Sequence, residues 1–342
     1  MLYLIYTYNN YCFEGKDSCP DRFYAHFMKK MTGKAIMKNI KTNFSKQILI
    51  IAVALLIALP VRVYQYLHVI DGTTGFYNTW SNPTVFGLYG LCALVIILVV
   101  ALSLKNSKKT IYAMPVGKKT SVGIASLAAA IAFLVESGYN AYRVFLITSG
   151  QLAQEQLVIG DNIGKPTLVF MCIQVLFGLL STAFFALLAV SFLSGKEQYK
   201  KAVLLAVSPV IWGVARLMIG FTQTISYRYV SELLFDLFMI VFMCMFGVAF
   251  AKMCAGVLES RVQMRLFAYG ILAAFFALLS AVPRYIMVLM SRLDVLYRQT
   301  GIGEVTDLVL PIFIMVMIFA IAATKQYKSV EEYSVEETAQ GE

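Results

Sequence analysis

Four arginines lie inside long apolar stretches of the sequence, where a charged side chain is rare. They are Arg62, Arg143, Arg216 and Arg284. Charge in hydrocarbon is costly, so such residues face a helix bundle interior, a water-filled cavity or the lipid headgroups. Because a guanidinium binds carboxylates and phosphates through paired hydrogen bonds, these arginines favour either an anion site or ion pairs within the protein.

Acidic residues stand close to these arginines in the sequence. Glu232 and Asp236 are spaced i,i+4, so they share one face of a helix. Asp307 opens the last apolar stretch, where it complements the positive end of a helix dipole. We predict a ligand site on the outer side of a membrane, formed by these residues: Arg62, Arg143, Arg216, Arg284, Glu136, Glu232, Asp236 and Tyr139. The alternative interpretation is that the acids neutralise the arginines and that the aromatic residues form an interfacial belt.

Sequence motifs for catalysis are missing. The chain has no P-loop, no HExxH and no GxSxG pattern. It has only two histidines, and its six cysteines do not have the spacing of a zinc or redox site. We therefore predict no catalytic residue, no metal and no cofactor, and the interpretation leans away from an enzyme.

Composition indicates the class of protein that must position these residues. Of 342 residues, 59% are hydrophobic and 14% are charged, and the mean hydropathy is +0.73. Soluble domains carry about 25% charged residues, and one of this length lacks the interior to bury so much apolar surface. These values exclude a disordered chain, a fibrous chain and an ordinary soluble enzyme. They predict an all-α, polytopic integral membrane protein.

The apolar stretches are long enough to count as membrane spans. A helix needs about 20 apolar residues to cross a hydrocarbon core of about 30 Å. Eight stretches meet this condition: 47–67, 84–104, 120–148, 167–194, 202–222, 232–254, 266–290 and 305–324. The third and fourth are longer than one crossing needs, which predicts tilt or projection from the membrane.

The distribution of lysine and arginine predicts the orientation of these spans. The formal net charge is +10, and most of the 29 Lys and Arg residues lie in the N-terminal segment, the C-terminal segment and every second connector, including 105–119. Basic connectors remain in the cytoplasm, so both termini are predicted to be cytoplasmic. The same rule explains the positive charge without a nucleic acid partner. The predicted location is the plasma (inner) membrane of a bacterium.

The spans can be grouped into four helical hairpins. The first member of each pair carries one arginine in its outer half, and the second member ends on a lysine: Lys105, Lys196, Lys252 or Lys325. The second members also begin with helix-capping residues such as Asn82-Pro83-Thr84. Two interpretations stay open, a true fourfold repeat and a set of unrelated hairpins that obey the same membrane rules.

Three segments follow from this reading. Residues 1–46 form a basic cytoplasmic segment, 47–324 the eight-helix transmembrane domain, and 325–342 an acidic, disordered cytoplasmic tail. Met37 begins a normal basic lead-in to the first span. One hypothesis is therefore that Met37 is the true start and that residues 1–36 do not belong to the native protein.

Function is predicted only at the level of class. The favoured hypothesis is a non-enzymatic membrane protein that binds or transports a small anionic or amphipathic ligand, with an anionic lipid headgroup as one candidate. The second hypothesis is a structural or accessory subunit of a larger complex, for example the permease-type partner of an ATPase. The third is a membrane enzyme that acts on a lipid-linked substrate, which would need converging polar groups that the sequence does not define.

Overall fold

We describe the protein from a computed structural model. The chain divides into two units, 1–44 and 45–342, and every described residue lies in the second unit. Predictions about residues 1–44, including the hypothesis about Met37, lie outside the described residues. The structure describes the following ranges: 46–71, 77–78, 82–105, 111–112, 114–115, 117–150, 165–222, 230–256, 260–292, 304–323 and 326–327.

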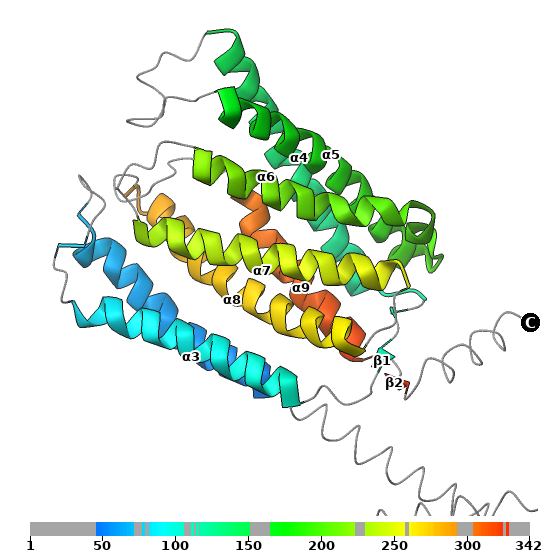
Figure 1. The fold of residues 1–342 in the computed structure, drawn as a ribbon, viewed down its shortest axis with the longest axis horizontal. Coiled ribbons are helices and arrows are strands. Elements are labelled where there is room, and N and C mark those ends of the chain that lie inside the picture. The colour runs from blue at the N-terminus through cyan, green and yellow to red at the C-terminus, as the bar shows by residue number, and fades with distance from the viewer. Residues whose placement is uncertain are drawn as a thin grey trace, which may run out of the picture. The chain divides into compact units, whose positions relative to one another are not determined.

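The described part of the chain is almost entirely helical. Its elements, in chain order, are a first helix Lys46–Val69 that ends in the π-helical segment η1 (Gln65–Val69), α3 (Pro83–Lys105), β1 (Ile111–Tyr112), α4 (Thr120–Thr148), α5 (Lys165–Ser194), the 3₁₀ segment η2 (Gln198–Val207), α6 (Ser208–Thr222), α7 (Val230–Cys254), α8 (Ser260–Leu289), α9 (Val305–Ala322) and β2 (Gln326–Tyr327). Figure 1 shows the long helices of this unit.

Eight of the helices within the described ranges are long and apolar enough to cross a membrane. This confirms the predicted all-helical class and the number of helices that are able to span a membrane. Two spans begin clearly earlier than predicted: α8 begins at Ser260, six residues before the predicted start, and the fifth span begins at Gln198 in the 3₁₀ segment, four residues before it. Eight helices of this length and composition indicate a multi-pass membrane protein.

The fifth span is irregular because Pro209 lies near the start of α6. Proline has no N–H group, so it cannot bond the carbonyl of Leu205 four residues earlier. The hydroxyl of Ser208 donates a hydrogen bond to that carbonyl at 2.7 Å instead. The span therefore joins η2 and α6 without a regular α-helical turn between them, and its backbone is also non-helical at Ala202.

Helix α8 is the central element of this unit. It packs against α7, α9 and α3, and 78% of its apolar window is buried within the protein. The first helix and α3 are each only 28% buried, so most of their apolar surface is left for lipid. Helices α4 and α5 pack closely on each other, and Figure 1 shows their outer ends extending beyond α6.

Contacts between neighbouring helices do not follow the predicted pairs alone. Helix α7 packs more extensively against α8, across a predicted hairpin boundary, than against α6. The grouping into four equivalent hairpins therefore stays a prediction. A short antiparallel pairing of Ile111 with Tyr327 and Tyr112 with Gln326 adds two strands that the sequence did not predict. This pairing brings connector 105–119 and the start of the acidic tail to the same end of the bundle.

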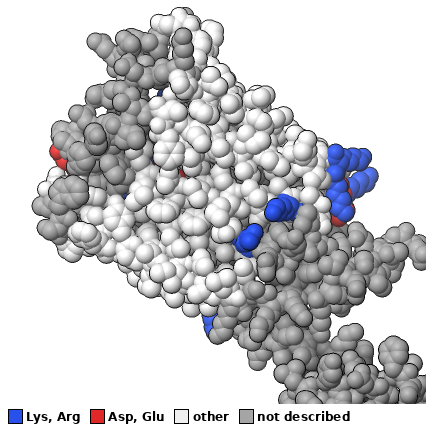
Figure 2. Space-filling view, viewed as in Figure 1, with Lys and Arg blue, Asp and Glu red and all other residues white. Residues whose placement is uncertain are grey.

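The two ends of the bundle differ in charge. We call the end with β1 and β2 the lysine end, because exposed basic side chains gather there: Lys118, Lys119, Lys196, Lys200, Lys201, Lys252 and Arg265. Figure 2 shows blue basic side chains near this end and an uncharged white surface over most of the described face. We call the opposite end, where α7 and α9 begin, the cluster end, because a cluster of charged side chains is buried near it.

Candidate functional site

Charged side chains are buried together near the cluster end. Within the described ranges they comprise three arginines and five acids, which we call the ionic cluster: Arg62, Arg216, Arg284, Glu136, Glu232, Asp236, Glu304 and Asp307. All are exposed by 5% or less. They come from the first helix, α4, α6, α7, α8 and α9, including the residue directly before α9. The cluster therefore joins helices that are far apart in the sequence, from the first described helix to the last.

Arg216 joins α6 to α9. Its two terminal nitrogens lie 2.5 and 2.7 Å from the two carboxylate oxygens of Asp307. This is a bidentate pair, the strongest arrangement that arginine makes with a carboxylate. Glu304 lies 3.9 Å from the same guanidinium, and the ring of Trp212 lies 5.6 Å from it on the preceding turn of α6.

Arg284 gathers more acids than any other described arginine. Its Nε atom lies 3.1 Å from Glu232, and one terminal nitrogen lies 2.9 and 3.0 Å from the two oxygens of Asp236. The other terminal nitrogen contacts Glu304 and lies 3.3 Å from Asp307. The guanidinium of α8 is thus surrounded by carboxylates from α7 and from the start of α9.

Arg62 has aromatic and amide partners. It donates hydrogen bonds to Gln65 at 3.0 Å and to the hydroxyl of Tyr66 at 3.3 Å. Its guanidinium carbon also lies 4.6 Å from the ring of Tyr66 and 4.8 Å from the ring of Phe235 on α7. Such cation–π contacts stabilise a desolvated cation. Phe235 directly precedes Asp236, so Arg62 brings the first helix to the edge of the cluster.

Glu136 lies on the α4 side of the cluster. Its carboxylate accepts a hydrogen bond from the hydroxyl of Thr306 and one from the amide of Gln174 at 3.5 Å. Both donors are neutral. Among the described residues, Glu136 forms no ion pair with an arginine or lysine within 4.0 Å.

Charge in the described cluster does not balance. Five acids stand against three arginines, which leaves two more negative than positive groups when all are ionised. Glu232 and Asp307 occupy the first turns of α7 and α9, where the helix dipole offsets part of a negative charge. The described basic side chains alone do not offset this excess, and burial makes an uncompensated negative charge costly.

Six of the eight predicted site residues meet in this cluster. Arg143 and Tyr139 are the exceptions, and both are only partly buried on α4. Arg143 follows Glu136 by seven residues, about 10 Å along the helix, which carries it towards the projecting end of α4. No ion pair of Arg143 is present within the described ranges. Convergence of all four arginines is therefore not observed.

The sequence analysis missed several partners. Glu304 contacts both Arg216 and Arg284, Ser280 lies between Asp236 and Arg284, and Thr306 holds Glu136. One local signal was present, because Ser280 and Arg284 are spaced i,i+4 on α8. Glu304 and Thr306 flank the start of α9, and only the packing of distant helices brings them to their partners.

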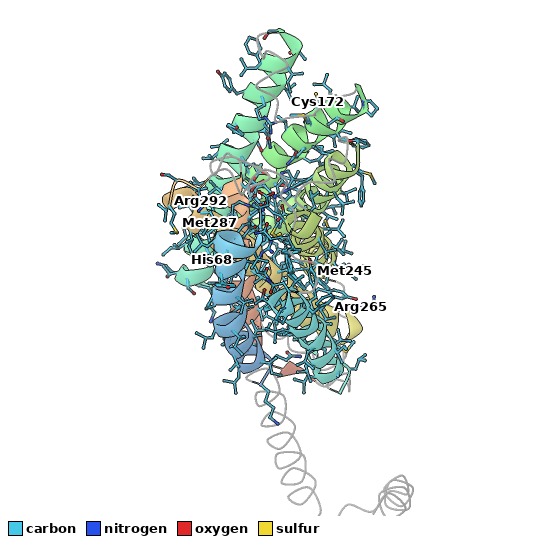
Figure 3. All side chains as sticks on the ribbon, turned by 90° about the vertical axis from the view of Figure 1, so that its left-hand side faces the viewer. His68, Cys172, Met245, Arg265, Met287 and Arg292 are labelled. Carbon is cyan, nitrogen blue, oxygen red and sulfur yellow. The ribbon has the colours of Figure 1, made fainter. Side chains whose placement is uncertain are left out.

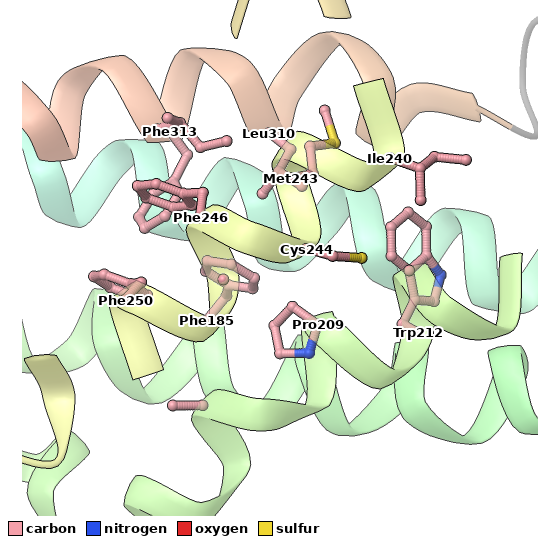
Figure 4. A pocket seen from close by; sticks show the side chains of 14 residues that line it. Phe185, Pro209, Trp212, Ile240, Met243, Cys244, Phe246, Phe250, Leu310 and Phe313 are labelled. Carbon is pink, nitrogen blue, oxygen red and sulfur yellow. The ribbon is translucent and has the colours of Figure 1, made fainter. Parts of the chain in front are cut away.

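An apolar pocket lies next to the ionic cluster, one helical turn towards the lysine end. On α6 its lining includes Pro209, Trp212 and Gly213, which lie within the two turns before Arg216. On α9 its lining includes Leu310, one turn after Asp307. Figure 4 shows its further walls, which include these side chains: Phe185, Met243, Cys244, Phe246, Phe250 and Phe313. Trp212 therefore contacts both the pocket and the cluster.

Metal ligands do not gather within the described ranges. No group of three or more His, Cys, Asp or Glu residues there has the geometry of a metal site. Figure 3 shows His68 and Cys172 on well-separated elements, the first helix and α5. Cys92, Cys172, Cys244 and Cys254 are free thiols.

Comparison with protein-family models, with curated proteins and with solved structures found no match for this chain. The fold and the site define a class of protein: a multi-pass helical bundle with a buried, acid-rich ionic cluster beside an apolar pocket.

Proposed function

We propose that this is a non-enzymatic membrane protein that binds and transports a small amphipathic ligand with a cationic group. The observation that carries this proposal is the buried excess of acids in the ionic cluster, five against three arginines within the described ranges. The cationic group would lie at the acids of the cluster, and the apolar part of the ligand would lie in the neighbouring pocket.

The contacts of the arginines favour a cation over the anion expected from the sequence. Arg216 and Arg284 are already paired with carboxylates, so an anion entering the cluster would have to displace those acids. It would also be repelled by the carboxylates that remain. A cation gains attraction from the excess acids and from the ring of Trp212, which lines the pocket.

The apolar pocket supports an amphipathic ligand. Ligand sites are typically lined by apolar and aromatic side chains, with a few polar groups that fix the orientation of the ligand. Here those polar groups stand at one end of the pocket, because Arg216 and Asp307 each lie within one turn of pocket residues on α6 and α9. The pocket has a volume of about 30 Å³, so a ligand of one cationic group and one short aliphatic group would match this arrangement.

The proposal includes an orientation. We infer that the lysine end faces the cytoplasm of a bacterial cell, with both termini inside, because basic residues are retained on that side. The ionic cluster then lies in the outer half of the bundle, and a ligand would enter from outside.

A second candidate is a structural or accessory subunit. The bidentate contact between Arg216 and Asp307 and the acids around Arg284 fasten α6, α7, α8 and α9 to each other, which favours a purely structural role for the cluster. In that case the cluster would take no exogenous cation.

Protection of a native cysteine distinguishes these candidates. Cys244 lines the pocket, whereas Cys172 is exposed on α5. The protein is purified, reconstituted in liposomes and treated with a maleimide in the presence of ethyltrimethylammonium, a permanent cation with one short alkyl group. We expect this probe to slow labelling of Cys244 in a saturable manner and to leave Cys172 unaffected. Equal labelling of Cys244 with and without the probe, together with no saturable binding, would contradict the ligand site.

A further inference from the structure

Glu136 differs from the other acids of the ionic cluster in its partners. Glu232, Asp236, Glu304 and Asp307 each lie within 4.0 Å of an arginine. Glu136 is 1% exposed, and among the described residues it accepts hydrogen bonds only from the neutral side chains of Thr306 and Gln174. An ionised carboxylate is expensive in such an interior, and a proton is the simplest way to remove its charge.

The balance of charges in the cluster also favours a proton on Glu136. With all described groups ionised, the cluster carries two excess negative charges, and one proton on Glu136 reduces this excess to one. If a monovalent cation then binds and the proton leaves, the excess is again one. Exchange of a proton for a cation therefore keeps the buried charge constant, which avoids the cost of placing additional charge in the bundle.

Further buried polar side chains lie next to Glu136 along α4. Ser137 is 2% exposed, and its hydroxyl has no hydrogen-bond partner among the described residues, so it lies unpaired at the contact of α4 with Gly178 of α5. Asn140, one turn further along α4, is 8% exposed and lies towards the cluster end. Gln174 faces the same region from α5.

We propose that Glu136 carries an exchangeable proton, and that a cation binding at the ionic cluster displaces it. This inference rests on the proposed function. In the exchange, the O–H bond of the Glu136 carboxyl breaks, the proton passes to water at the cluster end, and the cation takes over the neutralising charge. Thr306 and Asp307 are adjacent at the start of α9. Thr306 donates a hydrogen bond to Glu136, and Asp307 accepts one from Arg216, so the first turn of α9 contacts both residues.

The groups that surround Glu136 define the electrostatics of this exchange. Its charged and titratable neighbours within the described ranges are Arg216 on α6, Asp307 and Glu304 at the start of α9, and Tyr285 on α8. Helix α5 faces it with the uncharged Gln174. The nearest acids repel an ionised Glu136, and Arg216 attracts it. Arg216 is paired with both oxygens of Asp307, so Asp307 already neutralises much of the positive charge that would attract Glu136.

Infrared spectroscopy tests the proton without any ligand. In lipid bilayers at neutral pH, the protein should show the carbonyl band of a protonated carboxyl, and Glu136→Gln should lose it. Glu197→Gln is the control and should keep the band, because Glu197 lies at the lysine end, outside the cluster, and is paired with Lys200. If Glu136→Gln fails to fold, Glu136→Asp should shift the position of the band. Absence of the band in the native protein, or its persistence unshifted in the Glu136 variants, would overturn the proposal.

Proton counting tests the exchange. Ethyltrimethylammonium carries no titratable proton, so any proton released on its binding comes from the protein. In weakly buffered solution we expect roughly one proton released for each cation bound, and none from Glu136→Gln. Binding without release would overturn the exchange and leave the ligand site standing. Failure of the probe to bind would reject the proposed function together with the exchange, while the infrared result would still decide the protonation of Glu136.

Discussion

The guanidinium of Arg284 contacts four carboxylates in the buried interior of the bundle. Its contacts with Glu232, Asp236 and Asp307 measure 3.3 Å or less. Moving such groups out of water costs several kcal/mol for each ion, and close pairing with well-directed hydrogen bonds offsets much of that cost. The cluster is therefore stable only as a set, and removing one member exposes its partner to the full desolvation penalty.

Substitution of Arg216 tests this interdependence. Arg216→Gln leaves Asp307 without its bidentate partner, so we expect the free energy of unfolding to fall by about 3–5 kcal/mol. The double variant Arg216→Met/Asp307→Leu removes both charges and should recover most of that loss. The measurement is unfolding by denaturant in detergent micelles.

Arg265 provides the control for this prediction. It is an exposed arginine at the lysine end, so Arg265→Gln should change stability by no more than about 0.5 kcal/mol. A double variant at positions 216 and 307 that is as unstable as the single variant would show that the cost comes from packing rather than from an uncompensated charge.

At the scale of elements, close approach of α4 and α5 depends on small residues at their contact, such as Gly178. Gly178 on α5 faces Ser137 on α4, and a Cβ atom at Gly178 would overlap the Ser137 hydroxyl. The two helices carry Glu136 and Gln174 in the same region. Their separation therefore controls the hydrogen bond between α5 and the carboxyl for which we propose proton exchange.

Alanine at Gly178 should separate these helices. We expect Gly178→Ala to destabilise the protein by about 1–3 kcal/mol, the usual cost of overpacking. Ser137→Ala/Gly178→Ala removes the overlapping hydroxyl and should recover stability. Gly138→Ala is the matched control, because its Cβ would meet nothing within 4 Å, and it should stabilise α4 by about 0.5–1 kcal/mol. Equal thermal midpoints for Gly178→Ala and Gly138→Ala would contradict the tight contact.

The elements themselves were predictable from the sequence, whereas their partners were not. A span is a local property of about 20 residues, so hydropathy alone placed α4 at 120–148, as the structure has it. Arg216 and Asp307 are 91 residues apart, and no spacing rule connects them. The equivalence expected of Arg143 also fails, because α4 is long enough to carry this residue beyond the acids that hold Arg216 and Arg284.

At the scale of the whole described unit, charge and apolar surface are arranged along one direction. Exposed basic side chains gather at the lysine end, the ionic cluster is buried near the opposite end, and large apolar side chains such as Leu56, Phe86 and Ile97 are exposed between them. A surface this apolar suits lipid rather than water. The asymmetry between the ends is what allows an orientation to be predicted at all.

The two ends of α4 provide a direct test of that orientation. Lys118 precedes the helix at the lysine end, and Thr148 ends it at the opposite end; both side chains are exposed. In a background with all six native cysteines replaced by serine, Thr148→Cys should react with a membrane-impermeant maleimide in intact cells. Lys118→Cys should react only after the membrane is permeabilised, because positive charge is retained on the cytoplasmic side. Since the two reporters stand at opposite ends of one continuous helix of 29 residues, about 43 Å long, they cannot lie on the same side unless α4 fails to cross the membrane. Labelling of Lys118→Cys alone in intact cells would invert the orientation and move the ionic cluster to the cytoplasmic half, and labelling of both would remove α4 from the set of spans.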